Sequence, residues 1–394
     1  MRAEAGAAYR PGGRRRSLKH MTALLAAQVP APAAGRRDAF AYLGPNWFTT
    51  VMGTGIVANA AVSLPAHWPG LRAVATLVWA LAAVLLVAVT AAWAVHLRRH
   101  RATALGHAAD PVMAQFWGAP PMAAMTVGGG ALLVGRDWLG LPAAVAADLV
   151  LWTAGTVGGL VVAVAIPYLM MTRHETGPGA AFGGWLMPLV PPMVSAANAA
   201  LLVPHLRSGQ LRLDLVLAGY AMFGISLVAT LVILPQLWAR LVHHRTGPAR
   251  LVPTLWIVLG PLGQSITAAH LLGTAAAGVL PEPYGPGAQV FALLYGLPAL
   301  GFALLWLALA AALAVHAARS APGGVPFTLA WWSFVFPVGT LVTGTAGLAA
   351  RTGSAALTTL AVALWLLLLV TWATAAARTF SGARRGDLLR PPSP

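Results

Sequence analysis

Long apolar runs, separated by short polar segments, divide most of the chain after residue 45. A run of about 18 or more apolar residues is long enough to cross a bilayer as a helix. The pattern predicts ten such spans, and the short connections predict that neighbouring spans pair as antiparallel hairpins. The predicted spans are 46–64, 71–97, 112–134, 143–171, 185–203, 213–240, 253–278, 287–317, 326–349 and 353–378.

The odd-numbered spans share a second pattern. Each begins near an aromatic residue, is interrupted by proline or a pair of glycines, and continues through small and hydroxyl residues. An interruption opens the helix backbone, which a membrane tolerates where protein or a water-filled cavity covers it. We therefore expect five kinked odd helices ringed around a central pore, with the even helices outside against lipid. The predicted kinks lie at Gly53, Gly55, Pro121, Pro191, Pro261 and Phe336-Pro337.

The interruptions recur at corresponding positions of the odd spans. Asn59 and Asn198 fall at the same offset when the spans are aligned at Met52, Pro121, Pro191, Pro261 and Pro337. Self-similarity of this kind indicates a repeated unit. Discontinuous helices in corresponding repeats point to a transport site.

Composition supports an all-α integral membrane protein, because 58% of the residues are hydrophobic, 9% are charged and mean hydropathy is +0.74. Cysteine is absent, which excludes disulfides and thiolate metal sites. We expect one transmembrane domain over 39–380, a basic disordered tail over 1–38 and a short cytoplasmic tail over 381–394. If translation begins at Met21 and not at Met1, the first 20 residues are not part of the protein.

Basic residues are unequally divided between the two sides of the predicted spans. Of the 25 Lys and Arg residues, 20 fall in tails and loops on one side and 5 on the other. Basic loops concentrate on the cytoplasmic side, so the bias predicts a multi-pass plasma-membrane protein with both termini in the cytoplasm. The five exceptions are Arg72, Arg136, Arg207, Arg212 and Arg351.

The polar residues of the odd spans are uncharged. All nine acidic residues are expected in tails, loops or helix ends, so we expect no carboxylate buried in the membrane. Hydroxyl and amide dipoles solvate a permeating ion weakly enough to let it leave; an alternative is that they only join helices. With arginines at the outer mouths, an anion is favoured over a cation. The candidate path residues are Thr54, Asn59, Thr126, Ser195, Asn198, Gln264, Ser265, Thr267, Thr340 and Thr343, together with His270.

His270 is the only histidine well inside a predicted span. It is a candidate proton shuttle or pH sensor, or a hydrogen-bonding partner of a neighbouring helix. The other histidines lack metal-ligand spacing, and no histidine follows His174-Glu175 at position 178, so the HExxH zinc motif is absent. We expect no metal and no cofactor. We also expect no enzymatic activity, because an intramembrane enzyme needs a buried acid–base or nucleophile–base pair and the sequence offers only His270 with hydroxyls.

Phe336 is the candidate gate, together with Pro337. Its ring lies near the middle of the ninth predicted span, on the helix richest in threonine and glycine. An aromatic at a kink often only packs, but hydrophobic constrictions also gate pores. Both interpretations remain open from spacing alone.

Two motifs, Gly44-PNWFTTVMGTGIVANA and Trp331-WSFVFPVGT, resemble the tellurite-resistance/dicarboxylate transporter family, which includes fungal sulfite efflux pumps and plant slow anion channels. The resemblance covers about residues 40 to 378, and the first motif is closest to the malate and sulfite branch. It implies ten helices as five hairpins around a pore, a homotrimer, and a pore-blocking phenylalanine at Phe336. Substrate is not implied, because members move malate, sulfite, chloride or nitrate.

We therefore expect transport of small anions, either C4-dicarboxylates such as malate or sulfite and other inorganic anions. Channel and carrier mechanisms both remain open, as does the direction of transport. An alternative is a proton-coupled dicarboxylate carrier that uses His270. A remote alternative is an intramembrane enzyme or a scaffold. The expected partners are a small anion, the bilayer and two further copies of the chain, without nucleic acid.

Overall fold

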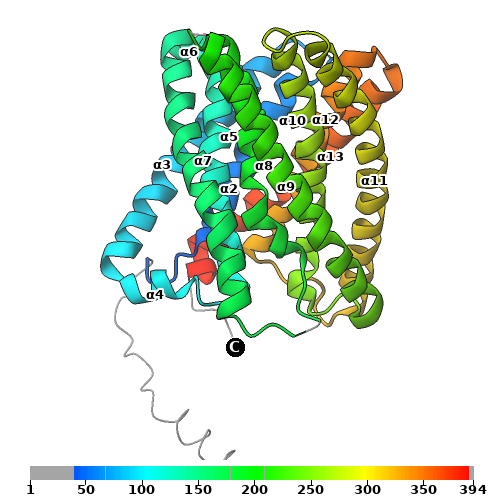
Figure 1. Ribbon diagram of the computed structural model, residues 1–394. Coiled ribbons are helices and arrows are strands. Elements are labelled where there is room, and N and C mark those ends of the chain that lie inside the picture. Colours follow the sequence, from blue (N-terminus) through cyan, green and yellow to red (C-terminus); the bar gives the residue numbers. More distant parts are fainter. Residues whose placement is uncertain (1–39, 67, 178, 208, 390–394) are drawn as a thin grey trace, which may run out of the picture. The chain divides into compact units, whose positions relative to one another are not determined.

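The computed structural model describes residues 40–66, 68–177, 179–207 and 209–389. Residues 39–394 form one unit, and its described residues are helical, without a strand (Figure 1). The predicted tail over 1–38, with Met21, lies outside the described residues. The predicted boundary at 380 falls inside the last helix, α13 (Ala355–Arg385). That helix ends at Gly386, whose φ of 73° allows the left-handed turn that commonly follows a helix.

Seven helical segments of the described chain are long and apolar enough to cross a membrane. An eighth results if the bent pair Gly183–Leu189 and Pro191–His205, with an angle of 44°, is one span. The ten predicted spans are thus found only in part by this measure, and the segments that contain α2 and α5 are not among those that qualify. The seven are Leu71–Arg99, Leu141–Thr172, Gly209–His244, Ala249–Ala277, Tyr284–Ser320, Leu329–Thr352 and Ala355–Arg385.

The helices pack as five sequential pairs (Figure 1). The first member of each pair is short and the second is long. The short helices are α2 (Phe48–Ser63), α5 (Ala119–Gly130), α8 (Pro191–Leu202), α10 (Leu259–Ala277) and α12 (Phe336–Thr352). Their partners are α3 (Leu71–Arg99), α7 (Leu141–Thr172), α9 (Gly209–His244), α11 (Tyr284–Ser320) and α13.

The five short helices also contact one another in order. α2 packs on α5, α5 on α8, α8 on α10, α10 on α12, and α12 on α2. They therefore form a closed ring, and we call them the inner helices. The small helices α4 (Arg101–Gly106), α6 (Arg136–Leu139) and η5 (Val203–His205) lie between other elements, and η8 (Asp387–Leu389) follows α13.

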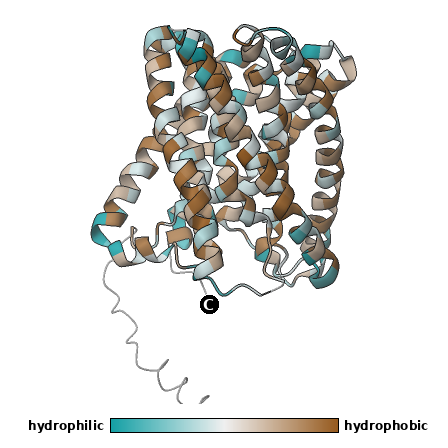
Figure 2. Cartoon of the chain, in the orientation of Figure 1, coloured by the Kyte–Doolittle hydropathy of each residue, from teal (hydrophilic) through white to brown (hydrophobic). Residues whose placement is uncertain are grey.

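Burial separates the two sets. In the spans that contain α10 and α12, 83% of the most apolar window is buried, whereas the value for the five long partners is 17–33%. The exposed side chains of the partners are nonetheless apolar, and Figure 2 shows hydrophobic colouring along their outer faces. Apolar surface of this extent suits contact with lipid.

A segment of 3₁₀ helix precedes each of the five inner helices. These segments are η1 (Pro45–Trp47), η2 (Met113–Gly118), η4 (Gly183–Leu189), η6 (Ala249–Val258) and η7 (Leu329–Phe334), before α2, α5, α8, α10 and α12. Pro121, Pro191 and Pro337 lie within the first turn of the α-helices that follow, where proline replaces an N–H that has no helical partner. The kinks predicted at these three prolines are therefore helix starts, and Phe336 lies at the first residue of α12.

The kinks predicted at Gly53 and Gly55 are wrong, because α2 is continuous from Phe48 to Ser63. The glycines serve close packing instead. A Cβ on Gly53 would lie 2.5 Å from Cε3 of Trp332, and a Cβ on Gly55 would lie 2.8 Å from Cγ2 of Thr126. These two positions thus let α2 approach η7 and α5.

Candidate functional site

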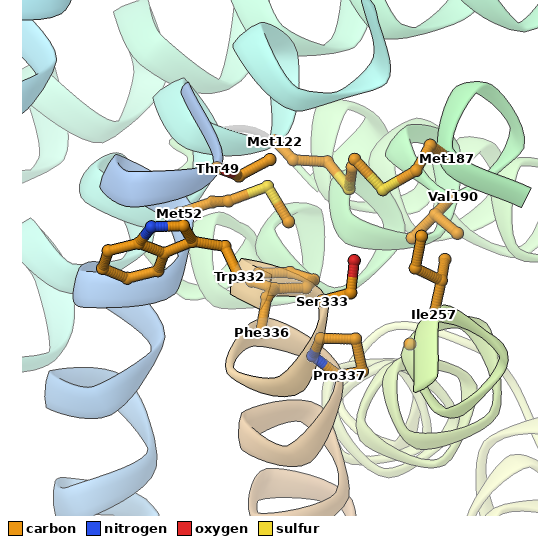
Figure 3. Close-up of a pocket in the computed structure, with 11 residues that line it drawn as sticks. Thr49, Met52, Met122, Met187, Val190, Ile257, Trp332, Ser333, Phe336 and Pro337 are labelled. Atoms are coloured by element: carbon orange, nitrogen blue, oxygen red, sulfur yellow. The ribbon is translucent and has the colours of Figure 1, made fainter. Parts of the chain in front are cut away.

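A narrow cavity lies inside the ring, where the inner helices begin (Figure 3). Its volume is about 20 Å³, which holds about one water molecule. Met52 of α2, Met122 of α5 and Met187 of η4 line it together with Phe336. We call it the narrow cavity, and its lining is almost entirely apolar.

Phe336 contributes its ring to this cavity from the start of α12 and is 3% exposed. Figure 3 shows it beside Trp332 and Pro337. Trp332 is held in place, because its Nε1 donates to Oγ1 of Thr379 at 2.9 Å and its ring packs on Gly53. The phenyl ring therefore occupies a tightly enclosed position in the lining of the narrow cavity.

A second, larger cavity lies toward the other end of the inner helices. Its volume is about 240 Å³, and we call it the wide cavity. Four inner helices (α2, α8, α10 and α12) bring six of the predicted path residues to its wall, and all six are polar. They are Asn59, Asn198, Gln264, Thr267, His270 and Thr343.

Four other predicted path residues, and Ser265, line neither cavity. Their hydroxyls bond within or between helices, as the alternative interpretation expected. Thr126 Oγ1 donates to the Met122 carbonyl at 2.7 Å, and Thr340 Oγ1 donates to the Pro337 carbonyl at 2.7 Å. Thr54 Oγ1 accepts from Trp372, while Ser195 and Ser265 bond to Thr156 and Tyr295.

Two asparagines of the wide cavity, Asn59 and Asn198, donate hydrogen bonds to the backbone of α5. Nδ2 of Asn59 donates to the Thr126 carbonyl at 3.1 Å, and Nδ2 of Asn198 donates to the Met125 carbonyl at 2.5 Å. A π-helical turn, η3 (Ala131–Gly135), follows, and such turns change which carbonyls the helix itself satisfies. The two asparagines thus support α5 and also line the wide cavity.

Arg351, at the end of α12, is a site residue that the sequence analysis counted only among loop charges. Its Nη2 donates to the His270 carbonyl at 3.2 Å and to Oγ1 of Thr274 at 3.0 Å, and lies 3.5 Å from Nδ1 of His270. A guanidinium only donates hydrogen bonds, so the last contact suits a neutral imidazole. The half-buried guanidinium places positive charge beside the wide cavity.

The expectation that no carboxylate is buried is wrong, because Asp148 lies eight residues into α7 and is 0% exposed. The predicted fourth span began at residue 143, which made Asp148 appear to lie at a helix end. The sequence also contained a signal that could have identified this residue, because Asp148 is the only acidic residue between Leu141 and Thr172. Among the described residues, no three His, Cys, Asp or Glu side chains gather as a metal site would require.

The comparisons with known proteins agree with one another. A family model described as voltage-dependent anion channel (SLAC1) matches residues 42–380. The sulfite efflux pump SSU1 of Arthroderma otae is 28% identical over 331 residues, covering 79% of this chain and 84% of the pump. The uncharacterized transporter MJ0576 of Methanocaldococcus jannaschii is 26% identical over 299 residues, covering 76% of this chain and 81% of that protein.

Proposed function

The chain belongs to the voltage-dependent anion channel family, the tellurite-resistance/dicarboxylate transporter family that its motifs resemble, and we propose that it carries sulfite or a related small anion through the ring of inner helices. It is a multi-pass membrane protein of an anion transporter family. The proposal includes no enzymatic role.

The observation that carries the proposal is the succession of the two cavities along the inner helices. Ile56 lines the wide cavity, and Met52, one turn earlier on α2, lines the narrow one. Gln264 and Gly260 are related in the same way on α10. An anion passing along the ring would meet weak dipolar partners first and then the constriction at Phe336, which suits conduction.

The arrangement in the membrane is part of the proposal. We infer ten membrane spans. In the spans of the inner helices, the preceding 3₁₀ segment completes the crossing of the bilayer. The charge bias supports both termini in the cytoplasm of a plasma-membrane protein. The family resemblance supports a homotrimer with one pathway in each subunit.

Sulfite is favoured over malate because three fungal relatives are named sulfite efflux pumps. The volume of the wide cavity does not discriminate between sulfite and malate, since about 240 Å³ accommodates either anion. The alternative of a proton-coupled dicarboxylate carrier gains one observation, namely that His270 lines this cavity beside Arg351.

The first test is anion flux into proteoliposomes containing the wild-type protein or the Phe336→Ala variant. Removing the ring is expected to raise sulfite flux by about tenfold, which corresponds to a barrier lowered by about 1.4 kcal/mol. Phe380→Ala is the matched control, because Phe380 is 64% exposed on α13 and should leave flux unchanged.

Flux of no anion in any variant, with protein folded in the bilayer, contradicts the transport proposal. Unchanged flux in Phe336→Ala contradicts the gate alone. Flux that disappears when the proton gradient is collapsed, and loses its pH dependence in His270→Ala, favours the carrier.

A further inference from the structure

Asp148 is a buried acid that the proposed pathway does not use. Its side chain is 0% exposed, and neither carboxyl oxygen has a hydrogen-bond partner among the described residues. The residue lies about 10 Å along α7 from the start of that helix at Leu141. An ionisable group inside a membrane protein without a partner is costly and is by default a candidate for function.

The elements around α7 offer nothing that would neutralise an ionised carboxylate. α7 packs against α5, α8, η2, η3 and η4, whose sequences contain no acidic, basic or histidine side chain. It also packs against α6, which carries Arg136 and Asp137. Asp137 pairs with Arg72, and Arg136 is exposed. An ionised Asp148 would therefore be a lone negative charge, so the neutral acid is the favoured form.

The carboxyl lies directly behind the wall of the wide cavity. A Cβ on Gly128 would lie 2.6 Å from Oδ1 of Asp148, and a Cβ on Gly129 would lie 2.9 Å from Oδ1 of Asn198. A Cβ on Gly130 would lie 2.9 Å from Oδ1 of Asn59. Three consecutive glycines of α5 thus separate the acid from two amides that line the cavity.

We propose that Asp148 is a proton-binding site linked to the occupancy of the wide cavity by an anion. At a pH high enough to ionise Asp148 in the empty protein, a proton from water adds to a carboxylate oxygen when the anion binds, and it returns to water when the anion leaves. The two negative charges would otherwise repel each other across a single helix. By linkage, protonation strengthens anion binding by the same factor by which the anion strengthens protonation.

The expected size of this coupling is about tenfold, from two unit charges about 10 Å apart at the effective dielectric of a protein. The inference rests on the proposed function, because it needs an anion in the wide cavity. It adds a coupled proton site that is separate from His270, which faces the cavity directly.

The test compares sulfite flux of the wild type and Asp148→Asn across a range from about pH 5 to about pH 9. Asparagine keeps the shape of the neutral acid and cannot ionise. Sulfite itself titrates in this range, but it does so equally for both proteins, so the ratio of the two fluxes isolates the protein. At subsaturating sulfite, the ratio of wild type to variant should fall by about tenfold from acid to alkaline pH.

Asp214→Asn is the matched control, because Asp214 is exposed and already accepts a hydrogen bond from Gln210. Its flux ratio to wild type should not change with pH. A constant ratio for Asp148→Asn, with normal sulfite flux in both proteins, overturns the inference and leaves the proposed function standing. Absence of sulfite flux in both overturns the proposed function.

A second measurement needs no variant. A hydrophobic carbodiimide adds to protonated carboxyl groups in apolar surroundings, and the modified peptide is identified by mass spectrometry. Labelling of Asp148 in the wild type should decline as pH rises, and sulfite should move that decline to higher pH by about one unit, the equivalent of tenfold coupling. Labelling that does not respond to sulfite overturns the inference.

Discussion

At the scale of single residues, Arg351 gives the wide cavity a charge that its lining lacks. The six polar lining residues predicted from the sequence include no charged side chain. Arg351 reaches toward them from the end of α12 and contacts His270 and Thr274. A cation at the mouth of a neutral cavity raises the local concentration of anions.

Replacing Arg351 with Gln should therefore weaken anion binding without closing the pathway. An anion about 8–10 Å away would lose about 1–2 kcal/mol of attraction. The half-saturating sulfite concentration should accordingly rise by about fivefold to thirtyfold, as measured by flux at increasing sulfite. Arg351→Lys should restore most of the affinity, because it keeps the charge, whereas equal losses in both variants would point to a structural role.

Residue type alone did not distinguish lining residues from residues that join helices. Thr343 and Thr340 lie one turn apart on α12, yet Thr343 faces the wide cavity and Thr340 bonds to the Pro337 carbonyl. Both are threonines that follow the same proline. The rotation of α12 about its own axis, relative to α10, decides which threonine faces the cavity. That rotation cannot be read from the sequence.

At the scale of elements, close contacts between inner helices depend on residues without side chains. Gly53 packs on Trp332, and a Cβ on Gly339 would lie 2.5 Å from Cγ1 of Ile56. A Cβ on Gly263 would lie 2.6 Å from the backbone nitrogen of Leu341. Small residues let membrane helices approach closely enough for dispersion forces to hold them.

Gly53→Ala should destabilise the protein by about 1–3 kcal/mol, because the new methyl group has to displace the Trp332 ring. The measurement is the melting temperature of the purified protein in detergent. Gly224→Ala in α9 is the control, since a Cβ there meets nothing within 4 Å. That variant should be unchanged or slightly more stable, because alanine favours a helix over glycine. Equal melting temperatures for the two variants would contradict the packing argument.

At the scale of the whole molecule, five helix pairs close one ring, although only seven or eight segments of the described chain qualify as spans by length and apolar composition. The segments that contain α2 and α5 are not among them. A ring of this kind has two ends, and the narrow and wide cavities lie toward opposite ones. The charge bias predicts that the narrow cavity lies on the cytoplasmic side.

That assignment is testable by cysteine labelling, since the natural chain contains no cysteine. Gly278→Cys places a thiol between α10 and α11, and Arg319→Cys places one near the end of α11. A membrane-impermeant maleimide added to intact cells should label the first variant alone, and both after permeabilisation. The reverse result would invert the orientation and place the Phe336 constriction outside.

The sequence by itself determined the class of protein, the helix pairs and much of the wide cavity. Apolar periodicity is a local property, and prolines and glycines mark interruptions wherever they occur, so these features were readable without a structure. The motifs around Gly53 and Phe336 also identified the family.

Only the tertiary structure decided what the interruptions do, because a proline that begins an α-helix and one that bends it look alike in sequence. It also decided the burial of Asp148. That burial depends on where α7 begins and on Gly128, which has no side chain and lets the carboxyl pack against α5. Burial and contact arise from the packing of distant segments, and that packing is what the order of residues along one helix leaves open.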